Sequence, residues 1–182
     1  MIIGIDEVGR GCWAGPLVAA AVVLNNLIEG LNDSKKLSKK RRAELALLIH
    51  ENAQVGIGWV SPGEVDELGL TEAVRLAMQR AVDELGVSAD EVIIDGNYNY
   101  LPHLAGSRAE VRADGSIAEV SAASIVAKVA RDTYMEQLDE AYLKWQFEKH
   151  VGYGTAAHIT ALNEHGVSDI HRLSYKPIKA FL

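Results

Sequence analysis

Apolar and polar positions along the chain form two kinds of pattern. The first kind, short apolar runs and alternating positions, predicts strands. Residues 1–7 and 17–24 are nearly continuous apolar runs, a pattern typical of strands buried on both faces. Residues 54–60 alternate between apolar and polar positions like a third strand. Shorter runs predict two more strands, over residues 91–94 and 108–113.

The second kind of pattern is helical, and residues typical of helix N-caps indicate where several helices begin. Ser61 is followed by Pro62 and then by Glu64, which is the arrangement of a capping box with proline in the first helical turn. The predicted helices cover residues 38–52, a segment from residue 61, then residues 71–86, 121–147 and 155–166. Helices mixed with strands in this order predict an α/β fold, with a mixed central β-sheet flanked by helices.

Length and composition limit the class of protein to which this chain can belong. With 182 residues, of which 48% are hydrophobic, we expect one folded domain over residues 1–182. A single cysteine excludes a disulfide framework and a cysteine-rich zinc site. The N-terminus lacks the pattern of a signal peptide, and the longest uncharged span, residues 12–28, contains Pro16 and is too short to cross a bilayer. We therefore expect a cytoplasmic protein with no membrane partner.

The net charge of −7 argues at first against a nucleic-acid-binding protein, but the charge is unevenly spread. Residues 1–42 carry a net charge of +3, residues 43–91 carry −8 and residues 92–182 carry −2. Six basic residues fall within residues 35–42. Such a run is either the solvated start of a helix or a surface that binds phosphates. Local charge is therefore more informative here than the total.

Four acidic residues stand out by their position. Asp6 and Glu7 follow one apolar strand, Asp95 follows another, and Asp132 lies one helical turn after Lys128. Carboxylates brought together near buried surface repel one another unless cations neutralise them, and oxygen ligands alone favour Mg²⁺ or Mn²⁺ over zinc. The alternative interpretation is that these acids only mark the points where the chain leaves the core and enters solvent. Neighbours on a regular strand point to opposite faces, so Asp6 and Glu7 are expected to share a site only where the strand ends or bulges.

Seven short blocks, taken in order, resemble the signature of the ribonuclease HII family. They are GIDEVGRG at residues 4–11, AGP at 14–16, DSKKLS at 33–38, IDG at 94–96, SAASIVAKVARD at 121–132, GYGT at 152–155 and HR at 171–172. The resemblance extends from residue 4 to about residue 176. Each block alone is a weak signal, whereas the ordered set is specific.

This resemblance implies a ribonuclease H-like fold in which residues from about 134 to 182 form a helical C-terminal extension. It also implies an endoribonuclease that hydrolyses the RNA strand of RNA/DNA hybrids and cuts 5′ of ribonucleotides embedded in duplex DNA. Catalysis would use two divalent ions, Mg²⁺ or Mn²⁺, and leave a 3′-hydroxyl and a 5′-phosphate. Carried over by position, the catalytic and metal-binding acids are Asp6, Glu7, Asp95 and Asp132.

The same resemblance implies where the nucleic acid binds. The turn of Gly9, Arg10 and Gly11 would place its backbone against the 2′-hydroxyl that distinguishes RNA from DNA. Tyr153 would pack on the sugar 3′ of the scissile phosphate. The remaining expected substrate contacts are phosphate contacts from Lys35, Lys36 and Lys128. For Lys128, pairing with Asp132 is the alternative. Members of the family are usually monomers, and we expect one here.

The chain also departs from the family pattern. Cys12 and Trp13 follow the turn where proline is usual, and Val151 replaces a basic residue. Leu173 and Tyr175 stand where the family often has a basic residue and phenylalanine. Ser121, Ser124 and His158 are interpreted as packing or structural groups, because no partner at suitable spacing makes them a nucleophile or a general acid.

Two other classes of function remain as hypotheses. One is a different enzyme of the ribonuclease H-like superfamily, either ribonuclease HIII or a DNA nuclease. Ribonuclease HIII is disfavoured because it usually carries an extra N-terminal domain, while the motif here begins at residue 4. The other is a non-catalytic module that binds nucleic acid or divalent metal, which would be expected to lack at least one of the four acids.

Overall fold

A mixed β-sheet forms the centre of the molecule in the computed structural model, which describes residues 1–138 and 140–182. The strands lie in the order β3-β2-β1-β4-β5. Their bounds are β1 Ile2–Val8, β2 Leu17–Leu24, β3 Ala53–Val60, β4 Glu91–Asp95 and β5 Ser107–Glu110. β1 is antiparallel to β2 and parallel to β4, so the sheet changes direction at its central strand.

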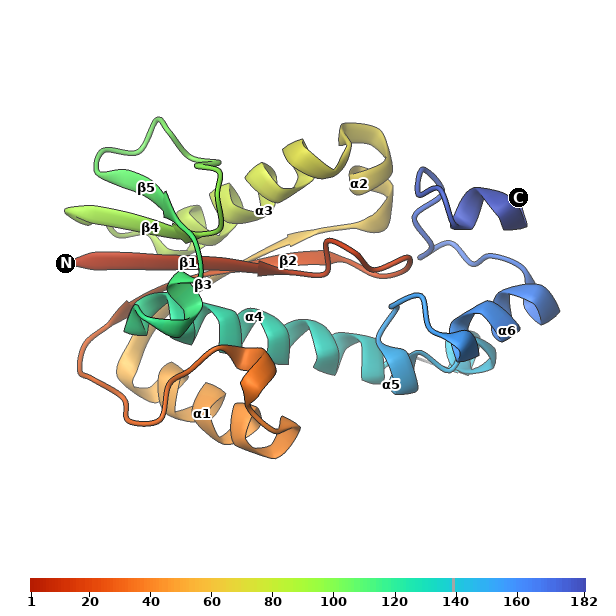
Figure 1. Ribbon diagram of the computed structural model, residues 1–182, viewed down its shortest axis with the longest axis horizontal. Coiled ribbons are helices and arrows are strands. Elements are labelled where there is room, and N and C mark those ends of the chain that lie inside the picture. The colour runs from red at the N-terminus through yellow and green to blue at the C-terminus, as the bar shows by residue number, and fades with distance from the viewer. Residues whose placement is uncertain (139) are drawn as a thin grey trace.

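Helices cover both faces of this sheet (Figure 1). The helices are α1 Lys39–Asn52, α2 Pro62–Leu68, α3 Leu70–Leu85, α4 Ala118–Glu136, α5 Phe147–His150 and α6 Ala156–His165. α3 lies on one face, and α1 and α4 lie on the other. This arrangement confirms the predicted α/β architecture. No helix in the described parts of the chain is long and apolar enough to cross a membrane.

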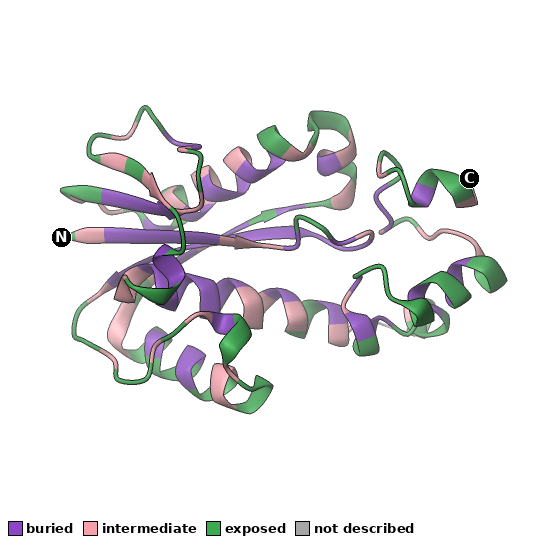
Figure 2. Ribbon diagram, viewed as in Figure 1, coloured by how far each residue is buried: buried purple, intermediate pink, exposed green. Residues whose placement is uncertain are grey.

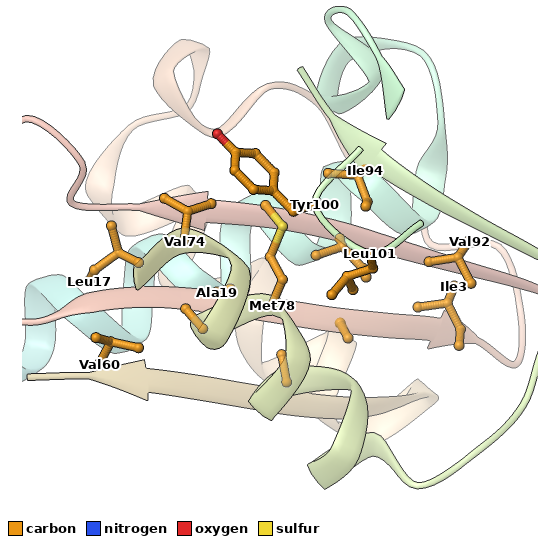
Figure 3. Packing of buried hydrophobic residues seen from close by; sticks show 14 of the residues in the cluster. Ile3, Leu17, Ala19, Val60, Val74, Met78, Val92, Ile94, Tyr100 and Leu101 are labelled. Carbon is orange, nitrogen blue, oxygen red and sulfur yellow. The ribbon is translucent and has the colours of Figure 1, made fainter. Parts of the chain in front are cut away.

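The strands are apolar on both faces because both faces are covered (Figure 2). On the face of α3, Ile3 and Leu17 pack with Val74 and Met78 (Figure 3). On the opposite face, the intervening residues of β2 pack against α1 and α4, whose contacting side chains are largely alanine, leucine and isoleucine. The alternation of side chains along each strand therefore divides the core into two layers.

Local signals placed most helix starts correctly. Ser38, Ser61 and Thr155 each accept a hydrogen bond from a backbone N–H in the first turn of the helix that follows. Ser61 and Glu64 form the full capping box. Gly86 ends α3 in the left-handed conformation, as expected at that position.

The prediction of one helix over residues 121–147 is wrong. α4 begins earlier and ends at Glu136, and the chain continues through the 3₁₀ segment Glu140–Trp145 into the short helix α5. Trp145 and Phe147 are nearly fully buried against Met135 and Ala14. The chain leaves the helix because these aromatic side chains bury more surface by folding back against the loop after β1.

The predicted strand over residues 108–113 is wrong at its end. β5 stops at Glu110, and Arg112 adopts a left-handed conformation with φ of 62°. A 3₁₀ turn over Ala113–Gly115 follows and leads into α4. This reversal buries Ala113 and Asp114 beside the sheet, where a continued strand would have carried them beyond its edge.

Candidate active site

The sheet register brings two of the predicted acids together. Ile5 of β1 pairs with Ile94 of β4 in the parallel ladder, so the next residues, Asp6 and Asp95, occupy neighbouring positions at the ends of adjacent strands. Asp6 lies on the face covered by α4, where it lines the same hollow as Ser124 of that helix. Its side chain is almost completely buried. Sequence spacing left this pairing open, and only the register decides it.

A third carboxylate, which the sequence interpretation missed, completes this cluster. The turn after β5 directs Asp114 at the end of β4, and its backbone N–H lies 3.4 Å from Asp95 Oδ1. Asp6, Asp95 and Asp114 each offer a carboxylate oxygen, and these oxygens all lie within 4.8 Å of one another. Asp114 follows no apolar strand and sits in a polar turn before a glycine, so no local pattern distinguishes it from a solvent-exposed acid.

Glu7 lies beside this cluster without any break in its strand. The ladder between β1 and β2 continues regularly through Glu7 and Val8, so the expected strand end or bulge at this point is absent. β4 pairs with β1 only as far as Ile5, which leaves the last part of β1 open on that side. Glu7 Oε1 accepts a hydrogen bond from Arg10 at 3.1 Å. Glu7 Oε2 is buried with no hydrogen-bond partner among the described residues.

Burial, followed by mutual repulsion, raises the pKa values of Asp6, Glu7 and Asp114. Burial, followed by the charge of Glu7, raises the pKa of Asp6 well above its usual value. Burial also raises the pKa of Glu7, although Arg10 opposes this effect. The pKa of Asp114 is raised by burial and by the charge of Asp95. A group of carboxylates that resists full ionisation by itself is the electrostatic setting in which a divalent cation binds favourably.

The donor set fits Mg²⁺ or Mn²⁺. It consists of carboxylate oxygens from Asp6, Asp95 and Asp114, together with the unpaired oxygen of Glu7. Hard oxygen ligands of this kind favour Mg²⁺ or Mn²⁺, and the cluster contains neither the thiolate nor the imidazole ligands typical of zinc.

Asp132 is placed apart from the acidic cluster. Its Oδ1 pairs with Lys128 Nζ at 2.9 Å. It lines a different hollow, together with Lys39, Arg42 and Glu136. Of the four predicted ligands, the structure brings together Asp6 and Asp95, adds Asp114 to them, and places Glu7 beside them on the same hollow as Asp6. The assignment of Asp132 as a ligand stays a prediction.

Two hollows border the acids, and four of the predicted substrate contacts, Lys35, Lys36, Lys128 and Tyr153, line them. The first hollow, of about 220 Å³, is lined by Asp6, Glu7, Val8, Ser34, Lys35, Ser124, Lys128 and Tyr153. The second hollow, of about 440 Å³, is lined by Asp33, Lys35, Lys36, Asp95, Arg112, Asp114 and Gly115. Lys35 belongs to both. Basic side chains thus border the acidic cluster on the side from which a phosphate backbone would approach.

Only part of the basic run reaches these hollows. Lys39 pairs with Glu136 at 2.7 Å, and Arg41 pairs with Glu44 at 3.3 Å. Arg42 donates hydrogen bonds to the carbonyl oxygens of Ser34 and Leu37, and so holds the loop that carries Lys35 and Lys36. The start of α1 is partly a solvated helix end, which is one of the two sequence alternatives. The preceding turn borders the candidate site, and phosphate binding there stays a prediction.

Tyr153 lies at the mouth of the first hollow beside Lys128. The Lys128 ammonium is 5.5 Å from the centre of the tyrosine ring. Tyr153 is 37% exposed to solvent. Burial raises the pKa of the Tyr153 hydroxyl to about 12, so the ring is neutral at physiological pH. A neutral, partly exposed aromatic face next to a cation is suited to contact a sugar and its phosphate together.

A buried pair of histidines holds the backbone of Tyr153. His171 Nδ1 accepts a hydrogen bond from the Ser168 N–H at 2.8 Å, so His171 Nε2 carries the proton and donates to His158 Nε2 at 3.0 Å. His158 Nδ1 then donates to the Tyr153 carbonyl at 3.0 Å. His158 is fully buried in this chain of contacts, which agrees with its interpretation as a structural residue.

Acid should break this histidine pair. Burial lowers the pKa of both His158 and His171 to about 4. An unfolded chain takes up these protons near pH 6.5, so the free energy of unfolding should fall as pH drops from about 6.5 to about 4, and this contribution is complete above that range. The measurement is the thermal midpoint at several pH values between 7.5 and 4. His158→Gln should flatten this dependence, while His103→Gln, which changes an exposed residue, should leave it unaltered.

Comparisons with known proteins identify the family of this chain. The ribonuclease HII family model matches residues 3–178. The chain belongs to the ribonuclease HII family. Ribonuclease HII of Vibrio parahaemolyticus is 51% identical over 186 residues, covering 100% of this chain and 87% of that protein. Ribonuclease HII of a Shewanella species is 49% identical over 189 residues, covering 100% of this chain and 90% of that one.

Solved structures show the same fold. The ribonuclease HII in the PCNA:RNase HII complex from Archaeoglobus fulgidus has a TM-score of 0.81 and 29% identity, covering 100% of this chain and 96% of that chain. Bst-RNase HIII, solved in complex with Mn²⁺, has a TM-score of 0.72 and 19% identity, covering 98% of this chain and 68% of that one, and it supports the fold alone. As a member of this family, the chain is a hydrolase of the ribonuclease H class, an endonuclease that acts on RNA/DNA hybrids.

Proposed function

We propose that this chain also cuts 5′ of single ribonucleotides embedded in duplex DNA, by two-metal hydrolysis of the phosphodiester, leaving a 3′-hydroxyl and a 5′-phosphate. One observation carries the proposal: Asp6 belongs to the carboxylate cluster with Asp95 and Asp114, and together with Glu7 it lines the hollow that Tyr153 also lines. Acids for metal binding and an aromatic surface for a sugar are thus present in one place.

Asp6, Glu7, Asp95 and Asp114 would hold Mg²⁺ or Mn²⁺. The bound ions supply an activated water and stabilise the charge on the leaving oxygen. The protein side chains keep the carboxylates together and partly exclude bulk water, which strengthens each electrostatic contact. Ser34 and Ser124 line the same hollow and hydrogen-bond each other at 2.9 Å.

The nucleic acid would be held by the groups that border the two hollows. Lys35, Lys36 and Lys128 would contact phosphates. Tyr153 would pack against the sugar 3′ of the cut. The turn of Gly9, Arg10 and Gly11, which leads from β1 next to Glu7, would contact the ribose through its backbone.

We also propose that the protein acts in the cytoplasm and as a monomer. Its single cysteine, Cys12, is buried, and burial raises the pKa of the thiol, so the residue is compatible with a reducing compartment. Sedimentation at micromolar concentration tests the oligomeric state. A sedimentation coefficient of a dimer would contradict the proposal.

A cleavage assay tests the proposed substrate range. Wild-type protein is mixed with a DNA duplex that contains one ribonucleotide, with an RNA/DNA hybrid and with an all-DNA duplex, each in Mg²⁺ and in Mn²⁺. We expect a single cut 5′ of the embedded ribonucleotide, cuts within the RNA of the hybrid and none in the all-DNA duplex. An intact single-ribonucleotide duplex in both metals would contradict the proposal. Binding without cleavage of any substrate would favour the non-catalytic module.

Phosphate binding by the two lysines predicts a change in salt dependence. Replacing both Lys35 and Lys36 with alanine should weaken binding and make the slope of log affinity against log salt shallower by about 1 to 2, because each phosphate contact contributes about 0.9. The measurement is the affinity for the hybrid between 50 and 200 mM salt, a range over which the effect is large. Lys176→Ala and Lys179→Ala together remove the same charge elsewhere. An equal change of slope in that control would show that only net charge matters.

A further inference from the structure

The turn that follows β1 is held in place by one buried arginine from the C-terminal part of the chain. The Arg172 guanidinium is inaccessible to solvent. Its Nη1 donates to the carbonyl oxygens of Gly9 at 2.6 Å and Arg10 at 3.3 Å, and its Nη2 donates to the Gly15 carbonyl at 2.9 Å. No carboxylate pairs with Arg172 in the described part of the chain. Its donors are therefore directed at backbone carbonyls of this loop.

Tyr175 adds a second contact to the same turn. Its hydroxyl accepts a hydrogen bond from Arg172 Nη1 at 2.9 Å and donates one to the Arg10 carbonyl at 2.6 Å. The Arg172 guanidinium carbon lies 5.2 Å from the centre of the tyrosine ring. Phenylalanine, the residue expected at this position from the family resemblance, has no hydroxyl and would leave the Arg10 carbonyl with the longer contact to Arg172 alone.

Because the peptide bond is planar, the contacts that fix the direction of the carbonyl groups also fix the direction of the N–H groups. In a trans peptide, the C=O of one residue and the N–H of the next point in opposite directions, and no peptide bond in the described chain is cis. The carbonyls of Gly9 and Arg10 face the buried guanidinium, so the N–H groups of Arg10 and Gly11 face away from it. Arg10 and Gly11 are both exposed, and neither N–H has an acceptor among the described residues.

Two adjacent, unpaired N–H groups on an exposed turn beside Glu7 form a site for ligand oxygens. Gly11 has open space where a side chain would begin, so a sugar can approach the backbone closely there. We propose that Arg172 and Tyr175 are positioning residues for ribose recognition: they fix the turn of Gly9, Arg10 and Gly11 so that its N–H groups meet the ribose. This inference rests on the proposed function of the turn, and the Tyr175 hydroxyl is the part that this chain adds to the family pattern.

The test separates ribose recognition from folding. Affinity is measured without divalent metal, so that no cleavage occurs, for a duplex with one ribonucleotide and for the same duplex in all-DNA form. Tyr175→Phe should lower the preference for the ribonucleotide two- to tenfold, the effect of losing one hydrogen bond that orders the turn. Affinity for the all-DNA duplex and the thermal midpoint should stay nearly unchanged. Arg172→Lys keeps the charge but loses the forked donors, and should lower the preference further.

Tyr142→Phe is the matched control, because it removes a tyrosine hydroxyl that donates to Asp169 away from the turn. An unchanged preference in Tyr175→Phe would overturn the inference, and so would an equal loss of affinity for both duplexes. Tyr175→Phe decides the question even where Arg172→Lys destabilises the fold. Failure of the proposed function is visible separately, because wild-type protein would then show no preference for the ribonucleotide at all.

Discussion

Asparagine in place of Asp114 is expected to lower the metal-dependent rate of cleavage by about a thousandfold, which corresponds to about 4 kcal/mol of transition-state stabilisation. Asp114 supplies one of the three carboxylates whose oxygens lie within 4.8 Å of one another. The amide has nearly the same shape but carries no charge, so it cannot neutralise a cation. The rate is measured on a duplex with one ribonucleotide at saturating Mg²⁺, and binding of the duplex should persist.

Asp132→Asn is the matched comparison for this prediction. Asp132 is paired with Lys128 and lines a separate hollow, so we expect its loss to lower the rate less than tenfold. A thousandfold loss in Asp132→Asn together with a small effect in Asp114→Asn would instead make Asp132 the fourth ligand.

A second readout does not depend on activity. Removing one of the crowded acids relieves repulsion, so the thermal midpoint of metal-free Asp114→Asn should rise slightly above that of the wild type. Addition of Mn²⁺ should then raise the midpoint of the wild type more than that of the variant, because a ligand that binds only the folded state stabilises it in proportion to its affinity.

Gly4→Ala is expected to cause a large loss of stability, about 3 kcal/mol or more. A methyl group at Gly4 would overlap the backbone of Glu119 and Val120 at the start of α4. A backbone cannot move aside as a flexible side chain can, so α4 would be pushed away from β1. The thermal midpoint should fall by about 10 °C in a domain of this size.

The effect of Gly4→Ala should extend to catalysis, because α4 carries Ser124 and Lys128 to the first hollow above β1. Gly63→Ala in α2 is the control, because a methyl group there meets no atom within 4 Å. It should leave the midpoint unchanged or raise it slightly, since alanine favours a helix more than glycine does. Equal midpoints for Gly4→Ala and the wild type would show that α4 tolerates a shift from the sheet.

Much of the secondary structure could be predicted because its causes are local. The apolar run of β2 and the capping box of Ser61 and Glu64 act within a few residues, and both were located from the sequence. The end of α4 could not be located in this way. It depends on Trp145 and Phe147 finding a buried position against Ala14, which lies more than a hundred residues earlier in the chain.

For the site, Asp6, Glu7 and Asp95 could be identified as candidates because they follow apolar strands, and the side chains at such ends lie near buried surface. The ordered family blocks added the turn of Gly9, Arg10 and Gly11, the lysines and Tyr153. Asp114 was missed because its polar turn has no periodicity, and Asp132 was chosen because it lies in a helical block that resembles the family. Neither the strand order nor the fold of the turn after β5 can be read from spacing.

The family, the kind of chemistry and most strand and helix boundaries follow from residue types along the chain, because each depends on residues that are close together in sequence. Which carboxylates meet follows from packing alone, since it depends on the register between β1 and β4 and on the reversal at Arg112. Packing also brings Arg172 and Tyr175 to a turn more than 160 residues away in sequence. Side chains that are distant along the chain become neighbours only through packing, and electrostatic repulsion among the acids follows from that packing.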